Sequence, residues 1–119
     1  MASDTVTVET HTRGDGTQPP AHLGNPTEWG VVTITEGSTG DFTPLTVLEI
    51  GGGTWSYGKN LTTDGQYCYS NYYHPTDNHG STVKLAGSSL KAVAGAGKWS
   101  YANLTAGAIY TCETYYAKY

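Results

Sequence analysis

The sequence predicts an all-β protein: a small β-sandwich of two antiparallel sheets with an internal pseudo-repeat, one disulfide and an extended N-terminal segment. Three observations lead to this fold class. The composition favours strands and turns, with 10 Tyr and 16 Gly among 119 residues. Apolar and polar residues alternate over short runs, and no long window has the i, i+3, i+4, i+7 spacing of an amphipathic helix. Finally, residues 53–74 and 97–116 contain the same motifs in the same order.

The first half of the chain contains three strand patterns separated by breakers. Alternation predicts strands at 5–11, 28–36 and 44–50, the last ending at a run of three glycines. The segment 13–26 between the first two is rich in Gly and Pro, which is typical of a loop or linker. We therefore expect an extended N-terminal arm and linker over residues 1–26 and a β-sandwich domain over residues 27–119.

The second half of the chain contains five more strand patterns, and its run of small residues at 86–97 is the only stretch of the sequence that could form two helical turns. Its strand patterns fall at 54–58, 66–73, 81–86, 98–102 and 108–119.

The two similar segments suggest a duplicated hairpin. Each reads Trp-Ser-Tyr, then Asn-Leu-Thr, then a cysteine and a Tyr pair. We expect each Trp-Ser-Tyr to lie in one strand, each Asn-Leu-Thr to form the turn, and the cysteine strand to return alongside. In a sandwich of two such hairpins Trp55 and Trp99 would face each other as core aromatics. Alternation in the strand pattern at 28–36 adds Trp29, so the predicted core aromatics are Trp29, Trp55 and Trp99.

The cysteine count indicates an oxidising compartment. Cys68 and Cys112 occupy corresponding places in the two copies, and a pair in a small, loop-rich chain favours a disulfide. We therefore expect a secreted protein. The N-terminal residues lack the basic and apolar regions of a signal peptide, so we expect that peptide to have been removed.

The charge distribution narrows the classes of partner. The net charge is -4; residues 1–50 carry seven acidic side chains and one arginine, whereas residues 51–119 carry five lysines and three acidic side chains. A chain without a basic patch is not expected to bind nucleic acid. No apolar segment is long enough to span a bilayer, so we do not expect a transmembrane protein.

Several motifs resemble the lactococcin 972 family of secreted bacteriocins. The matching segments are TWSYG at 54–58, the run from Tyr69 to Val83, AGKWSYA at 96–102 and ETYYAKY at 113–119, so the resemblance covers about residues 51–119. It implies a sandwich of two three-stranded antiparallel sheets and an antibacterial function without catalysis. The type member of the family binds lipid II and blocks septum formation, and some actinobacterial relatives are linking subunits of umbrella-shaped secreted toxin particles.

Two departures from the type member favour the linking-subunit branch. This chain has about 50 additional N-terminal residues and a cysteine pair. An alternating segment such as residues 3–12 can add as a strand to a partner's sheet; alternatively, it completes a sheet of its own domain. We therefore predict an adaptor subunit of a secreted antibacterial assembly. The predicted partner-binding residues are Val6, Val8, His11, Arg13, Tyr72, Tyr73, His74 and His79.

Two other functions remain open at this stage. One is a stand-alone bacteriocin that binds lipid II or another cell-wall component through exposed tyrosines and the loop from His74 to His79. The other is a carbohydrate-binding module that stacks sugars on Tyr and Trp rings.

Catalytic and metal-binding patterns are weak. His74, Asp77 and His79 have a spacing that a metal could use, yet Pro75 and Gly80 indicate an ordinary polar loop between strands. Ser70 could act as a nucleophile with His74 and Asp77, but close sequence neighbours on one strand rarely have the mutual geometry that this requires. We predict no catalytic residues, no metal and no cofactor.

Overall fold

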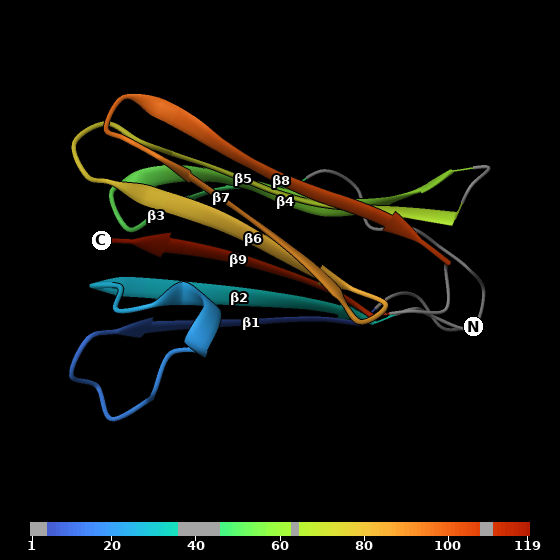
Figure 1. The fold of residues 1–119 in the computed structure, drawn as a ribbon, viewed down its shortest axis with the longest axis horizontal. Helices are drawn as coiled ribbons and strands as arrows, with labels where there is room; N and C mark the ends of the chain where they lie inside the picture. Colours follow the sequence, from blue (N-terminus) through green and yellow to red (C-terminus); the bar gives the residue numbers. More distant parts are fainter. Residues whose placement is uncertain (1–4, 36–45, 63–64, 108–110) are drawn as a thin grey trace.

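The chain folds almost entirely into β-strands. The computed structural model describes residues 5–35, 46–62, 65–107 and 111–119. The only helical turn in these ranges is a 3-10 helix, η1 (Ala21–Leu23). The strands are β1 (Thr5–Thr12), β2 (Glu28–Thr35), β3 (Thr46–Ile50), β4 (Gly53–Thr62), β5 (Gly65–His74), β6 (His79–Leu85), β7 (Ser88–Ala94), β8 (Lys98–Ala106) and β9 (Cys112–Lys118), as Figure 1 shows.

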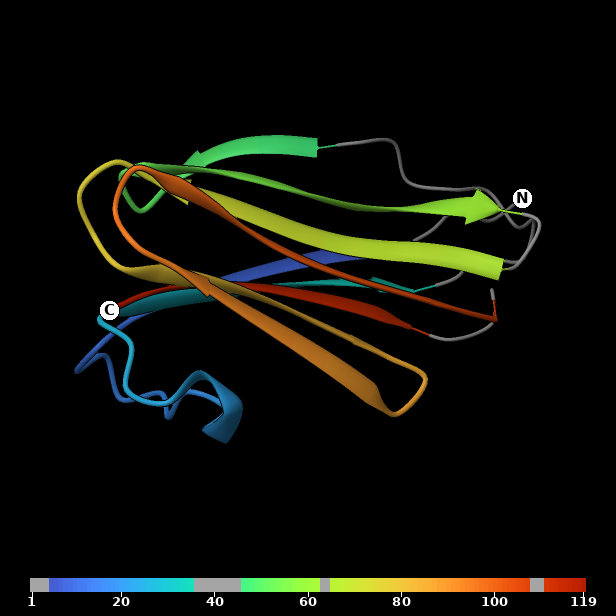
Figure 2. The same ribbon diagram turned by 45° about the horizontal axis from the view of Figure 1, so that its top comes forward.

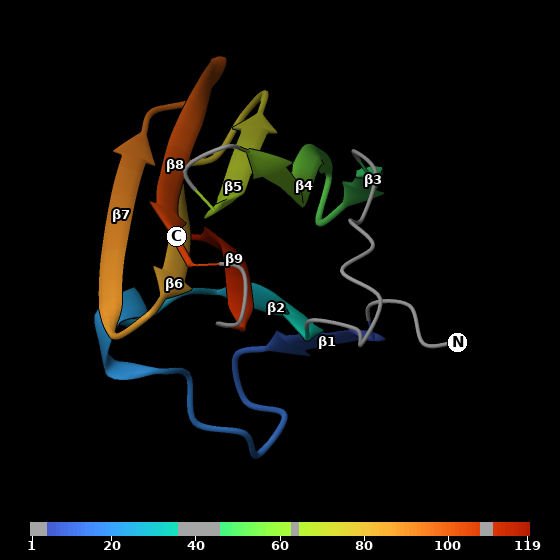
Figure 3. The same ribbon diagram turned by 90° about the vertical axis from the view of Figure 1, so that its right-hand side faces the viewer.

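The strands form two antiparallel sheets packed face to face, which confirms the predicted fold class. One sheet has five strands in the order β1-β2-β9-β6-β7, and the other has four in the order β3-β4-β5-β8. Figures 2 and 3 show the two layers from the side and from one end. Within residues 51–119 each sheet has three strands, as the family resemblance implies. The N-terminal residues then extend one sheet with β1 and β2 and the other with β3.

The N-terminal segment belongs to the sandwich. β1 pairs with β2 along its whole length, from Thr5 opposite Thr35 to Thr12 opposite Glu28. This arrangement is the alternative in which the segment completes its own sheet. Pairing satisfies the main-chain groups on one side of β2, whose other side bonds to β9.

Only the first of the two similar segments is a hairpin. β4 and β5 pair with each other, whereas β8 pairs with β5 in the four-stranded sheet and β9 pairs with β2 and β6 in the other. The predicted second hairpin is therefore wrong. The predicted turns are also wrong, because Asn60–Thr62 ends β4 and Asn103–Thr105 lies within β8. Period-2 patterning identifies strands but does not state which strands pair.

The two Trp-Ser-Tyr triplets face opposite sides of the same sheet. Trp55 is fully buried, whereas Trp99 is 39% exposed on the outer face. Asn60 and Asn103 are both exposed. The spacing from tryptophan to asparagine is five residues in the first copy and four in the second. Because strand side chains alternate between the two faces, this one-residue difference places the two tryptophan side chains on opposite faces of the sheet. The prediction that Trp99 is a core aromatic is wrong for this reason.

The core between the sheets combines aromatic packing with satisfied polar groups. Trp55 and Tyr72 each lie within 5 Å of the Tyr116 ring, at 4.8 and 4.9 Å between centroids. The indole N–H of Trp55 donates to Ser70 Oγ at 2.9 Å, and that hydroxyl donates to the Tyr115 carbonyl at 2.7 Å. These bonds remove the cost of burying the polar atoms.

The predicted disulfide is confirmed. Cys68 in β5 and Cys112 in β9 are bonded, with 5.9 Å between their Cα atoms, and both residues are fully buried. The bond therefore links the two sheets through the core.

A second apolar cluster lies on the outer face of the five-stranded sheet. Trp29, 6% exposed, packs there with Leu23 from η1 and with residues of β9. The connecting loop is held by Arg13, which donates to the carbonyls of Asn25 at 2.6 Å and Pro26 at 3.2 Å. The segment predicted as a linker is thus an ordered cover for this face.

Gly30 in β2 provides a test of core packing. A Cβ at this position would overlap Cε1 of the buried Tyr116 ring and lie 3.1 Å from the Glu9 carbonyl oxygen. We expect Gly30→Ala to lower the free energy of unfolding by about 1–3 kcal/mol, because overpacking forces the ring or the strand to shift. Urea denaturation measures the change. Gly95→Ala is the control, since its Cβ would meet only Asn78 Oδ1 at 3.8 Å; an equal loss in both variants would contradict the packing argument.

Candidate binding surfaces

The predicted polar loop is held by its two histidines. His74 and His79 are 4% and 0% exposed. His74 Nδ1 accepts the backbone N–H of Asp77 at 2.9 Å, so its Nε2 carries the hydrogen and donates to the Gly51 carbonyl at 3.0 Å. The nitrogens of His79 contact the carbonyl oxygens of Asp77 at 2.9 Å and Lys98 at 2.7 Å. Both rings therefore tie this loop to neighbouring turns.

The candidate metal ligands and the candidate nucleophile Ser70 lie at different depths in the fold, since Asp77 is partly exposed and the others are buried. Within the ranges that the structure describes, no group of three or more His, Cys, Asp or Glu side chains could hold a metal. Ser70 bonds to Trp55 and Tyr115 in the core, as described above, and its hydroxyl is fully buried.

The predicted partner-facing residues are dispersed. Tyr72, His74 and His79 lie inside the sandwich, and the Tyr72 hydroxyl donates to the Ile50 carbonyl at 2.9 Å. Their side chains therefore do not offer a surface, contrary to the sequence expectation. Tyr73 is partly exposed on the outer face of the four-stranded sheet.

The remaining predicted residues lie near β1. His11 packs on Trp29 with 4.6 Å between ring centroids and contacts Asp15 Oδ2 through Nδ1 at 3.0 Å. Arg13 holds the loop that follows, as described above. In β1, Val6 pairs with Ile34 and Val8 with Val32. β1 is the outermost strand of its sheet, and no other strand in the described ranges pairs with its second side.

Burial raises the pKa values of several tyrosines. Burial raises the pKa of Tyr72 and Tyr116 well above the usual range, and the nearby Glu28 carboxylate raises both further. The Tyr116 hydroxyl donates to Glu28 Oε2 at 2.7 Å. Burial, with a contribution from Glu113, also raises the pKa of Tyr115 to about 12. These hydroxyls therefore remain neutral at any physiological pH.

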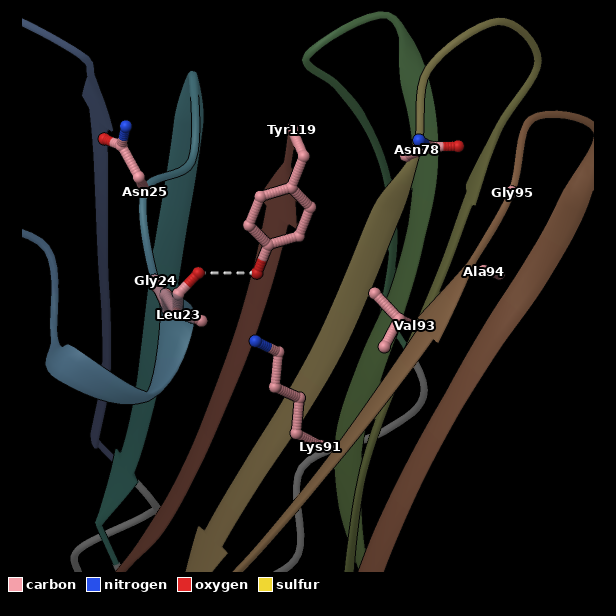
Figure 4. Close-up of a pocket in the computed structure, with 9 residues that line it drawn as sticks. All are labelled: Leu23, Gly24, Asn25, Asn78, Lys91, Val93, Ala94, Gly95 and Tyr119. Carbon is pink, nitrogen blue, oxygen red and sulfur yellow. Dashed lines mark hydrogen bonds between the residues drawn. The ribbon is translucent and has the colours of Figure 1, made fainter.

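A groove lies between η1 and the end of β7. Figure 4 shows its walls, and its volume is about 600 Å³. Tyr119 forms part of the lining and donates through its hydroxyl to the Leu23 carbonyl at 2.7 Å. Lys91 extends from β7 toward η1, with Nζ 2.9 Å from the His22 carbonyl oxygen and 5.5 Å from the centre of the Tyr119 ring. Val93, 66% exposed, is an apolar wall on the other side. The groove can accept an apolar side chain of a partner.

Sequence reasoning missed this groove because its lining comes from distant parts of the chain. The contributing segments are the end of η1 with the loop after it, Asn78 before β6, the second half of β7 with Gly95, and the C-terminal residue. No local pattern in any of them indicates a concave surface.

Aromatic and amide side chains gather on the outer face of the four-stranded sheet. Tyr73 lies opposite Trp99, and Asn71 lies opposite Tyr101, with Asn103 next along β8 on the same face. We call these five residues the aromatic face. Trp99 and Tyr101 are 39% and 59% exposed. The sequence signal that could have located this face is the shorter tryptophan-to-asparagine spacing in the second copy.

Comparison with known proteins identifies one family. A sequence model of the family described as Bacteriocin (Lactococcin_972) matches residues 51–116, which is more than half of the chain and includes β4 to β8 and most of β9. No curated protein and no solved structure matches the chain. Among the described residues, no helix has the length and apolar content needed to cross a membrane.

Proposed function

The chain belongs to the lactococcin 972 family of bacteriocins, and from this premise we propose that it is a secreted adaptor subunit of an antibacterial toxin complex. It acts without catalysis, by binding protein partners. The family assignment supports the antibacterial role, and the disulfide supports export to an oxidising compartment.

The observation that carries the adaptor proposal is the position of β1. This strand lies outside the segment matched by the family and forms an edge of the five-stranded sheet. An edge strand presents main-chain N–H and C=O groups to which a partner's strand can add. The N-terminal segment thus docks the partner through its free side while its other side remains bonded to β2.

An adaptor also needs a second, separate surface. β7 is the opposite edge of the same sheet, and the groove beside it is apolar enough to take a partner's side chain. Two partners can then bind at opposite edges without competing. The hydrogen-bonded strands β2, β9 and β6 between these edges keep the two surfaces at a fixed spacing.

Proline substitutions in β1 test the docking mode. Successive N–H groups of a strand point alternately toward and away from the neighbouring strand, so Glu9→Pro and Thr10→Pro affect different sides. The proline that removes a bond to β2 lowers the melting temperature. We expect the proline on the free side of β1 to leave the melting temperature nearly unchanged. In that variant the tagged chain should no longer recover a stoichiometric partner from culture supernatant.

The outcomes separate this proposal from the stand-alone bacteriocin. If the native secreted chain is recovered only as a free monomer, the adaptor role is wrong. Growth inhibition by the purified chain alone, neutralised by added lipid II, would instead support the stand-alone function. If both proline variants still recover the partner, the partner does not dock on β1.

A further inference from the structure

The aromatic face is preorganised by the sheet that carries it. Its residues alternate along β5 and β8 with side chains that enter the core, among them the buried Tyr72 and Ser100. Ser100 Oγ donates to the Tyr72 carbonyl at 3.2 Å and contacts Ser81 Oγ at 2.7 Å. The two strands are thus fixed from the inside, and a ligand on the outside meets an already ordered surface.

The three rings form a row in which Trp99 and Tyr101 are nearly parallel, whereas Tyr73 is tilted by 45° against Trp99. The centroids of Tyr73 and Trp99 are 5.6 Å apart, and those of Trp99 and Tyr101 are 6.1 Å apart with only 22° between the ring planes. Trp99 and Tyr101 keep 39% and 59% of their surface exposed although both are large aromatic residues. Exposed aromatic groups of this kind mark interaction sites.

The polar members of the face match hydroxyl groups. Asn71 and Asn103 adjoin the rings on the same side of the sheet. Each amide offers two donors and an acceptor, which is the combination that a sugar hydroxyl can satisfy in both of its roles. The partly positive C–H groups of a pyranose ring pack favourably against the negative face of an aromatic ring.

Charge decides between possible ligands. None of the five residues of the aromatic face is charged, and the directly paired outer positions of β4 are Thr54 and Ser56. Within the aromatic face a phosphate-bearing or acidic ligand would find no cation, because the neighbouring Lys98 alternates to the other side of β8, opposite His74. The chain as a whole carries a net charge of -4. The complement of a neutral surface of rings and amides is a neutral ligand with apolar faces and many hydroxyls.

We propose that the aromatic face is a binding site for a neutral polysaccharide chain, with pyranose rings stacked on Trp99 and Tyr101 and hydroxyls bonded to Asn71 and Asn103. This site goes beyond the adaptor function, since it lies on the other sheet from β1 and the groove and needs no protein partner. It would hold the assembly at a glycan-covered surface.

Affinity electrophoresis of the purified full chain tests the site. Native gels would contain hydroxyethylcellulose, glucomannan, laminarin or dextran, with carboxymethylcellulose as the charged counterpart of the first. We expect retarded migration in at least one neutral gel, and affinity roughly tenfold weaker for Trp99→Ala and for Tyr101→Ala, because each removes one stacking ring. Tyr101→Phe, which keeps the ring, should retain most of the binding.

Leu90→Ala is the matched control, because it truncates an exposed apolar side chain on the other sheet. It should migrate like the parent chain in every gel, and circular dichroism should show that all variants remain folded. The proposal is overturned if no neutral polysaccharide retards the chain, if only carboxymethylcellulose does, or if the two alanine variants bind as the parent does. It is also overturned if the two variants instead abolish self-association or binding to a protein partner.

These outcomes are independent of the adaptor function. The gels contain no partner, so a failure of glycan binding leaves the β1 experiment unaffected. Conversely, loss of the partner in the proline variants leaves the gel result unchanged.

Discussion

Replacing Cys68 and Cys112 together by alanine is expected to lower the free energy of unfolding by about 4 kcal/mol. The two residues are 44 positions apart in sequence, and in the chain-entropy account a crosslink closing a loop of that size destabilises the unfolded state by about this amount. A loss of 4 kcal/mol is a large part of the stability of an ordinary small domain. Alanine is preferred to serine because both positions are fully buried and a hydroxyl there would need a partner.

Urea denaturation of the double variant and of the parent chain measures this loss. The parent treated with a reductant should lose a similar amount of stability, whereas the double variant should not respond to the reductant. A double variant as stable as the oxidised parent would show that the interface between the sheets, and not the crosslink, holds them together.

Raising the pH above about 10 is expected to destabilise the protein by about 4 kcal/mol per pH unit. Tyr72, Tyr115 and Tyr116 have pKa values raised by burial, while the same side chains titrate near pH 10 in the unfolded chain. Above that pH the unfolded chain releases these protons and the folded chain retains them. Their contribution to stability is therefore complete below about pH 10 and is lost as the pH rises toward the folded-state pKa values.

The measurement is the free energy of unfolding in urea at a series of pH values between about 8 and 11. Tyr115→Phe supplies the control: it keeps the ring in the outer cluster and removes one titrating hydroxyl, so the slope should fall by about a third. Equal slopes in the parent and the variant would show that other groups cause the alkaline loss.

The periodicity of the sequence predicts eight of the nine strands in the described ranges but misses β7 (Ser88–Ala94), whose run of small residues shows little alternation. Alternation is a local property, so runs such as 5–11 and 66–73 identify strands without reference to the rest of the chain. The cysteine pair predicted the disulfide for a similar reason, because two cysteines in a chain of this kind leave a single pairing. The motifs at 54–58 and 69–83 placed the chain in its family.

The surface residues were predicted less well, because sequence alone did not state which face of a strand is covered. Tyr72, His74 and His79 are polar or amphipathic residues in a tyrosine-rich stretch, yet all three point between the sheets. Trp99 shares a triplet with Trp55 and lies on the opposite side. The relevant difference, one residue in the spacing to the next motif, is small beside the similarity of the motifs themselves.

The sequence by itself determined the strand content, the crosslink and the family. Only the tertiary structure decided that β8 and β9 separate into different sheets, that β1 forms one edge, and that rings from two strands form the aromatic face. The physical reason is that alternation depends on neighbours in the chain, whereas strand pairing and burial depend on contacts between residues far apart in it.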